Sequence, residues 1–217
     1  MEPSLNSARR PERVTLKGRY VTLVPVSLEH AGALHEASRI DDSVWDYLFE
    51  GPFPDQAAFN ESWQKKVNTT EAVFFTVAVN GAPVGYASLM RIDPANATIE
   101  VGNIMYSPAL QRTPAATEAQ YLLARYVFDE LGNRRYEWKC NARNAPSRRA
   151  ALRYGFQFEG IFRQHMIVKG RNRDTAWFSM LDSEWPARKA AFEEWLDPAN
   201  FDEAGGQKRA LARPDSL

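Results

Sequence analysis

The segment MYSPALQRTPAATEAQYLL (105–123) places the end of a strand, a short loop and the start of a helix in succession. The first turn of a helix has N–H groups without partners and a partial positive charge, so it forms a site for a phosphate group. The small residues Ala115, Ala116 and Thr117 let a ligand approach the backbone, and Arg112 adds a cation. We therefore expect a phosphate-containing ligand at this loop, although small residues also begin helices well without one.

Upstream of this segment the sequence predicts an antiparallel meander of three strands. Residues 72–92 are two apolar runs joined at Asn80-Gly81, the pair favoured by a type I′ hairpin turn. A second turn leads into a strand over 99–107, in which Asn103 is expected to mark a bulge. Such a bulge would separate this strand from the next one and open a slot between them.

The other predicted elements surround this meander. In chain order they are a strand over 19–27, helices over 28–39 and 54–68, a helix over 115–131, a strand over 135–141, a helix over 145–154, a hairpin within 155–181 and a helix over 186–196. Strand, helix and strand in succession form a right-handed parallel crossover. The order therefore predicts an α+β fold, an α/β mixed sheet of about seven strands with helices on both faces.

Composition and length narrow the class of protein. The 217 residues fit one large domain, over 14–185, between a flexible N-terminal arm (1–13) and a C-terminal helix with a polar tail (186–217). Lys plus Arg equals Asp plus Glu, at 27 each, which argues against nucleic-acid binding. We expect no membrane segment, because no apolar run approaches roughly 18 residues. The single Cys140 and the absence of a signal sequence favour a cytoplasmic protein.

The loop resembles the coenzyme A loop of the GNAT superfamily of acetyltransferases. That pattern is Gln or Arg, two residues, Gly, one residue, then Gly or Ala, and here Gln111, Pro114 and Ala116 occupy the three places. Pro114 stands where glycine is usual and has no N–H to donate. One backbone contact to a pyrophosphate is therefore in question, and the N–H groups of neighbouring residues become the expected donors.

A second motif lies at the distance that the resemblance requires. The segment NAPSRRAALRYGFQFEG (144–160) is similar to the Asn-x-x-Ser helix and Gly-Phe pair of the same superfamily, with Asn144 and Ser147 in register. The segment 16–23 also resembles the early L-x-G-R-x-V-x-L strand of the branch that acetylates the N-termini of ribosomal proteins. Without the resemblance, Asn144 would be read only as a helix cap.

The resemblance implies a GNAT-like fold and an N-acetyltransferase that moves the acetyl group of acetyl-CoA directly to a primary amine. The amine would belong to a protein N-terminus, an aminoacyl compound or a small molecule, and a homodimer is compatible with the sequence. No metal is expected, because the three histidines are scattered. The residues implied to bind the coenzyme are Met105, Tyr106, Gln111, Arg112, Thr113, Ala115, Ala116, Thr117 and Asn144.

Two catalytic groups follow from the same resemblance. Glu100 stands where many of these enzymes carry a strand glutamate that acts as general base, and the alternative is an ordinary ion-paired strand residue. Ser147 matches a serine that acts as general acid, with Tyr154 as a second candidate and backbone bonding as the structural alternative. His165 is an alternative proton acceptor, and Cys140 is expected to be a buried strand residue rather than an acyl carrier.

Two other functions are compatible with these motifs. The first is a GNAT-like module that binds acyl-CoA as a sensor with weak catalysis, for which Pro114 is an argument. The second is an unrelated α/β protein that binds a phosphate-containing ligand, which would have no reason to carry Asn144 and Ser147 at this distance from the loop. Binding of acetyl-CoA with or without release of free coenzyme separates the enzyme from the sensor.

Overall fold

The computed structural model describes residues 7–203 and 205–212, and its centre is one sheet of eight strands. The strand order is β1-β2-β3-β4-β5-β6-β8-β7, and only β5 and β6 pair in parallel among these neighbours. The strands are β1 (Leu16–Lys17), β2 (Thr22–Pro25), β3 (Val73–Val79), β4 (Ala82–Asp93), β5 (Thr98–Tyr106), β6 (Arg135–Asn141), β7 (Gln157–Val168) and β8 (Arg171–Leu181). The eighth strand, beyond the seven expected, is the two-residue β1.

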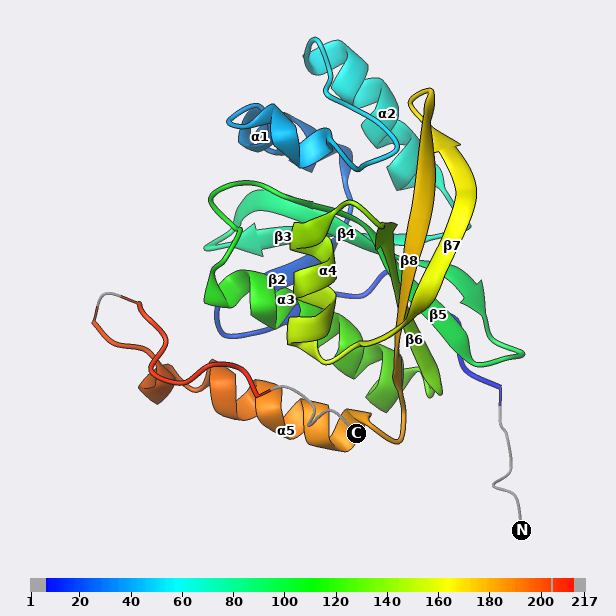
Figure 1. Ribbon diagram of the computed structural model, residues 1–217. Helices are drawn as coiled ribbons and strands as arrows, with labels where there is room; N and C mark the ends of the chain where they lie inside the picture. Colours follow the sequence, from blue (N-terminus) through cyan, green and yellow to red (C-terminus); the bar gives the residue numbers. More distant parts are fainter. Residues whose placement is uncertain (1–6, 204, 213–217) are drawn as a thin grey trace.

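Helices cover both faces of this sheet, as Figure 1 shows, with α1 and α2 on one side and α3, α4 and α5 on the other. The helices are α1 (Ala31–Ser38), α2 (Gln56–Asn68), α3 (Pro114–Arg125), α4 (Ala145–Tyr154) and α5 (Trp185–Leu196). The predicted helix 115–131 is α3 followed by one π-helical segment, Tyr126–Glu130. The predicted mixed sheet with helices on both faces is therefore confirmed.

Alternation along the central strands supplies two hydrophobic cores. Phe75 belongs to the larger core under α3 and α5, whereas its neighbour Phe74 points to the smaller core under α1 and α2. In the smaller core Trp63 and Tyr86 are almost fully buried, with their rings 5.3 Å apart. The meander turns at Asn80-Gly81, where φ is +51° and +82°. Two positive φ angles are what a type I′ turn requires, so that prediction is confirmed.

Both chain ends contact the body over their described parts. The expected arm includes residues 7–13, which lie against the domain: the N–H of Ala8 donates to the Pro94 carbonyl at 3.0 Å and that of Arg9 to Leu131 at 2.9 Å. Residues 1–6 of the expected arm lie outside the described residues. At the other end the expected polar tail folds around buried Asn200, whose amide donates to the Trp195 and Arg209 carbonyls.

Glu118 on α3 holds the turn between β1 and β2. Its buried carboxylate accepts three backbone N–H bonds, from Arg19 at 2.8 Å, Tyr20 at 2.6 Å and Val21 at 2.9 Å. A Cβ at Gly18 would lie 2.3 Å from this carboxylate, so the backbone approaches it closely because residue 18 has no side chain. These bonds fasten the edge of the sheet to α3.

We expect Glu118→Gln to lower the free energy of unfolding by about 2–4 kcal/mol. The amide keeps one acceptor oxygen and turns an NH₂ group toward backbone donors, so bonds to a charged acceptor worth about 1.5–3 kcal/mol each are weakened. Urea unfolding measures the loss. Glu61→Gln, at an exposed position of α2, is the control and should change stability by no more than about 0.5 kcal/mol. Equal losses in the two variants would contradict this role.

Candidate active site

The two parallel strands β5 and β6 separate in the middle of the sheet. Their pairing ends at Val101 and Trp138, although both strands continue beyond that point. Asn103 has φ +50°, and the register between β4 and β5 shifts across it, between Gly102 and Met105. Its amide donates to the Ser88 hydroxyl at 3.0 Å. The expected bulge at Asn103 is thus present, and it lies where the strands separate.

A cavity of about 930 Å³ occupies this separation and continues on both faces of the sheet. Its helical end, on the face of α3 and α4, is lined by the loop before α3, by α4 and by the C-terminal residues Trp195, Phe201 and 205–207. Its hairpin end is lined by the 43–49 loop and by residues of β4 to β8, among them Glu100 and Arg173. The cavity therefore joins the predicted phosphate loop to the predicted general base.

The start of α3 forms part of the helical end. Thr113 is the N-cap, and its hydroxyl accepts from the Ala116 N–H at 3.2 Å. The Thr117 N–H bonds the Thr113 carbonyl at 3.4 Å, whereas the described chain provides no partner for the N–H groups of Arg112, Thr113 and Ala115. Gln111 donates to the Tyr106 carbonyl at 2.8 Å and so braces the loop. Three free N–H groups thus remain for an anion, despite Pro114.

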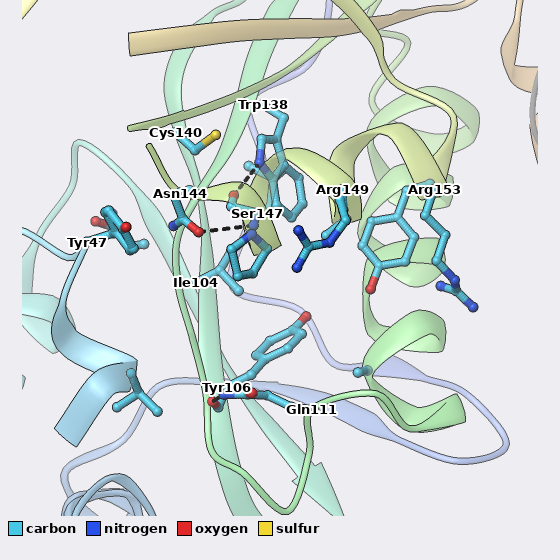
Figure 2. Close-up of a pocket in the computed structure, with 18 of the residues that line it drawn as sticks. Tyr47, Ile104, Tyr106, Gln111, Trp138, Cys140, Asn144, Ser147, Arg149 and Arg153 are labelled. Carbon is cyan, nitrogen blue, oxygen red and sulfur yellow. Dashed lines mark hydrogen bonds between the residues drawn. The ribbon is translucent and has the colours of Figure 1, made fainter. Parts of the chain in front are cut away.

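Two arginines on α4 add charge that sequence reasoning missed. Arg149 and Arg153 line the helical end together with Arg112, and Figure 2 shows both on the same stretch of α4. Arg153 donates to the Thr117 hydroxyl at 3.0 Å, and its guanidinium lies 4.7 Å from the centre of the Trp195 ring. Their i, i+4 spacing was the available signal, since residues four apart share one helix face.

Ser147 is held by its neighbours at the centre of the cavity (Figure 2). Its hydroxyl accepts from the Trp138 indole N–H at 3.0 Å, and its N–H donates to the Asn144 side chain at 3.0 Å. Asn144 is therefore the helix cap, and the Ser147 hydroxyl bonds a side chain rather than backbone. The same hydroxyl also has a side-chain hydrogen bond with the Cys140 thiol. Cys140 is a buried strand residue, and burial raises the pKa of its thiol, which favours the protonated form.

Glu100 lines the hairpin end of the cavity and is also ion-paired, so its role as a general base stays a prediction. Its side chain is 6% exposed and contacts Lys139 Nζ at 2.8 Å and Arg91 Nε at 3.0 Å. Lys139 also pairs with Glu137 at 2.6 Å and lies over the Trp177 ring. Burial raises the pKa of Glu100, and the cations Lys139 and Arg91 oppose that shift. A carboxylate with a raised pKa is a better proton acceptor than an exposed one.

His165 and Tyr154, the alternative acid–base groups, occupy different ends. His165 lies at the hairpin end with Nδ1 2.9 Å from the Thr175 hydroxyl. Burial and the cations Arg91 and Arg173 lower the pKa of His165, so the ring is neutral at pH 7. The Tyr154 hydroxyl lies beside Thr117 at the coenzyme loop. Its side chain therefore belongs to the phosphate-facing part of the cavity.

Two of the predicted coenzyme residues turn their side chains away from the cavity. Met105 is fully buried in the smaller core, and Ala115 packs in the larger one, so only their backbone atoms can face a ligand. The other predicted site residues line the cavity: Glu100, Tyr106, Gln111, Arg112, Thr113, Ala116, Thr117, Asn144 and Ser147. Tyr47 and Trp138 line the cavity as well, whereas Trp45 lies in the smaller core and Arg163 is exposed on β7.

No helix in the described part of the chain is both long and apolar enough to cross a bilayer. No three His, Cys, Asp or Glu side chains within residues 7–203 and 205–212 are grouped so that they could hold a metal ion.

Comparison with known proteins gives one family. A profile of the acetyltransferase (GNAT) domain matches residues 21–157. A GCN5-related N-acetyltransferase of Brucella melitensis is 52% identical, with a TM-score of 0.94 over 96% of both chains. A GNAT-family acetyltransferase structure of Chromobacterium violaceum is 41% identical (TM-score 0.81, 86% of this chain and 95% of that one). YdaF of Bacillus subtilis, a proposed ribosomal N-acetyltransferase, is 27% identical over 127 residues, which are 58% of this chain and 69% of YdaF. The chain belongs to the GNAT family of N-acetyltransferases.

Proposed function

We propose that this enzyme transfers the acetyl group of acetyl-CoA directly to a primary amine, with both substrates bound together. The observation that carries the proposal is the continuous cavity, which has three arginines and unpaired N–H groups at its helical end and a buried carboxylate at its hairpin end. The separation of β5 from β6 lies between them. A thioester in the separation would present its carbonyl to an amine that arrives from the other face.

The helical end fits coenzyme A in charge and in hydrogen-bonding groups. Arg112, Arg149 and Arg153 offer three cations, and the start of α3 offers free N–H groups, to a ligand with a pyrophosphate and a further phosphate. Beyond Val101, β5 has lost its partner β6, so backbone groups there can pair with the amide groups of an extended ligand arm. The Asn144 amide lies beside that path. Pro114 removes one donor, and the guanidinium groups compensate for it.

The residues on both sides of the separation can move the protons that the reaction requires. Glu100 accepts a proton from the amine as its nitrogen forms a bond to the acetyl carbon. When the carbon–sulfur bond breaks, the Ser147 hydroxyl donates its proton to the departing thiolate and is reprotonated from solvent. The Trp138 N–H already bonds the serine oxygen, so it favours release of the serine proton. One proton leaves the amine and one proton reaches the thiolate, so the reaction is balanced in protons.

A coenzyme-release assay with a panel of amines tests the proposal. Purified protein, acetyl-CoA and each amine are incubated, and free thiol is measured as it forms. Binding of acetyl-CoA is measured in parallel by calorimetry. Thiol release that depends on the amine supports the enzyme. Tight binding without release from any amine would instead favour the sensor, and the absence of binding would remove both.

We expect Ser147→Ala to slow single-turnover acetyl transfer by about 10- to 100-fold. This loss of rate lies at or below the lower end of the range expected for removal of a general acid. The reason is that a thiolate whose thiol has a pKa of about 8.5 leaves readily without a proton donor. Stability should fall by about 1–3 kcal/mol, since the buried Trp138 N–H loses its acceptor. Trp138→Phe removes the same bond and keeps the hydroxyl, so it should slow the reaction less than Ser147→Ala does. A rate per folded molecule equal to that of the wild type would show that Ser147 is structural.

A further inference from the structure

The hairpin end of the cavity contains more positive charge than its pairing requires. Lys139 and Arg91 both contact the Glu100 carboxylate, and Lys139 is shared with Glu137. Arg173, on β8, also lines this end, but it forms no ion pair with any carboxylate of residues 7–203 or 205–212. A guanidinium is charged at all ordinary pH values, and a buried charge without a partner is costly. A group outside this chain is therefore expected to complete the pairing.

Arg173 is buried and held in place. The residue is 7% exposed, and its Nε donates to the Thr175 hydroxyl at 3.2 Å. The guanidinium carbon lies 5.0 Å from the centre of the Phe49 ring, which covers one of its faces. Its two terminal amino groups make no hydrogen bond within the described chain. The Nε edge of the guanidinium is thus fixed, and Phe49 covers one of its faces. The two terminal amino groups form a fork of N–H donors that is free at the cavity wall.

Neighbouring titratable groups leave this fork available. Glu100, whose negative charge acts on Arg173, already contacts Lys139 and Arg91. His165 contacts the same Thr175 hydroxyl, and burial together with nearby cations lowers the pKa of its ring. Asp46 lies on the loop that forms the opposite wall, and the tip of the β7–β8 hairpin fixes that loop through Lys169, whose amine donates to the Trp45 carbonyl at 2.8 Å. The fork is therefore the expected contact for an anion.

We propose that Arg173 binds an anionic oxygen group of the acceptor, so that the preferred acceptor is a primary amine that also carries a carboxylate. The inference rests on the proposed acetyl transfer, and it narrows the substrate class. A planar fork of two N–H donors matches a carboxylate with two parallel bonds. Glu100 and Arg173 line the same end of the cavity, so one small molecule can present its amine to the first and its acid to the second.

The test uses amines in pairs with and without an acid group, each pair compared at equal concentrations of the neutral amine. Glycine is compared with glycinamide, 4-aminobutyrate with butylamine, and phosphoethanolamine with ethanolamine. The last pair shows whether a phosphate group is preferred instead of a carboxylate. We expect kcat/KM to favour the carboxylic acid over its uncharged partner by about 10- to 100-fold, as bonds between charged groups suggest. Arg173→Gln should remove this preference by raising KM for the acids. The kinetics with amines that carry no acid group should stay unchanged. Arg163→Gln, at an exposed position of β7, is the control and should keep the preference.

Several outcomes would overturn the inference. No preference for acids in the wild type would do so, as would a preference confined to phosphoethanolamine. So would an equal fall of kcat for acids and uncharged amines in Arg173→Gln, since that result places the guanidinium on the reacting carbonyl. If Arg173→Gln fails to fold, Thr175→Val serves instead, because it releases Nε and should raise KM for acids alone.

A second measurement separates this inference from the proposed function. Calorimetry of glycine and glycinamide on the protein loaded with coenzyme A reads acceptor binding without turnover. Acid-specific binding that Arg173→Gln abolishes supports the anion site even if no acetyl transfer occurs. Absence of acid-specific binding, while acetyl transfer to uncharged amines proceeds, overturns the anion site and leaves the proposed function standing.

Discussion

Glu100→Gln should lower turnover by about 10²–10⁴-fold and leave the affinity for acetyl-CoA unchanged. The amide is close in size to the carboxylate but cannot accept a proton, so the variant loses what a positioned general base contributes. Coenzyme affinity should persist because Glu100 lines the hairpin end, away from the phosphate loop. Glu137→Gln is the matched control: Glu137 shares Lys139 with Glu100 but is not part of the described cavity wall. Steady-state kinetics and calorimetry on both variants give the comparison.

The pH dependence supplies a second readout for Glu100. A base works when deprotonated, so wild-type activity should rise with pH through the pKa of Glu100, which burial raises above its ordinary value. The amine substrate must also lose its proton, and this adds a rise at higher pH. In Glu100→Gln only the second rise should remain. If Glu100→Gln keeps wild-type turnover and still shows the rise at lower pH, the general base is another group, and His165 is the next candidate.

Arg153→Glu should raise the dissociation constant for coenzyme A by about 30- to 1000-fold at low salt. The change replaces a cation by an anion near a ligand with several negative charges, and Coulomb's law at an effective dielectric constant of about 20–80 gives roughly 2–4 kcal/mol. It also removes the contacts to Thr117 and to the Trp195 ring. Titration calorimetry measures the affinity, and the effect should shrink as salt screens the charges.

Two control variants keep the Arg153 result interpretable. Arg134→Glu makes the same change of net charge at an exposed position whose side chain contacts Asn96, and it should leave coenzyme affinity nearly unchanged. Arg153→Gln removes the charge without reversing it, so its loss should be intermediate. Similar affinity for all three variants and the wild type would show that α4 does not meet the phosphates.

The local pattern of the sequence was sufficient for most of the fold. Alternation and turn residues predict the strands from β2 to β8, and the Asn80-Gly81 turn has the backbone angles its residues favour. The strand β1 was missed because two residues cannot show alternation. Its pairing depends on Glu118, about a hundred positions along the chain, and no local pattern reports such a contact.

The candidate site was only partly predictable for a related reason. The positions of Glu100 and Ser147 follow from motifs, and each proved to line the cavity. Arg173 is one of 27 lysines and arginines, and its sequence neighbours do not distinguish it. What marks it is burial together with the lack of a carboxylate partner, and both depend on which strands and loops surround it. Such properties arise only when the chain has folded.

The continuity of the cavity also suggests a route to inhibition. A molecule that joins coenzyme A to the acceptor amine through a short acyl bridge would fill both ends at once. It loses translational and rotational freedom a single time, whereas two separate ligands lose it twice, so its affinity should exceed that of either part. A bridge that ends in a carboxylate-bearing amine should gain further from Arg173. Such a conjugate would also hold the 43–49 loop and the β7–β8 hairpin in one arrangement, which favours crystals of a substrate-like state.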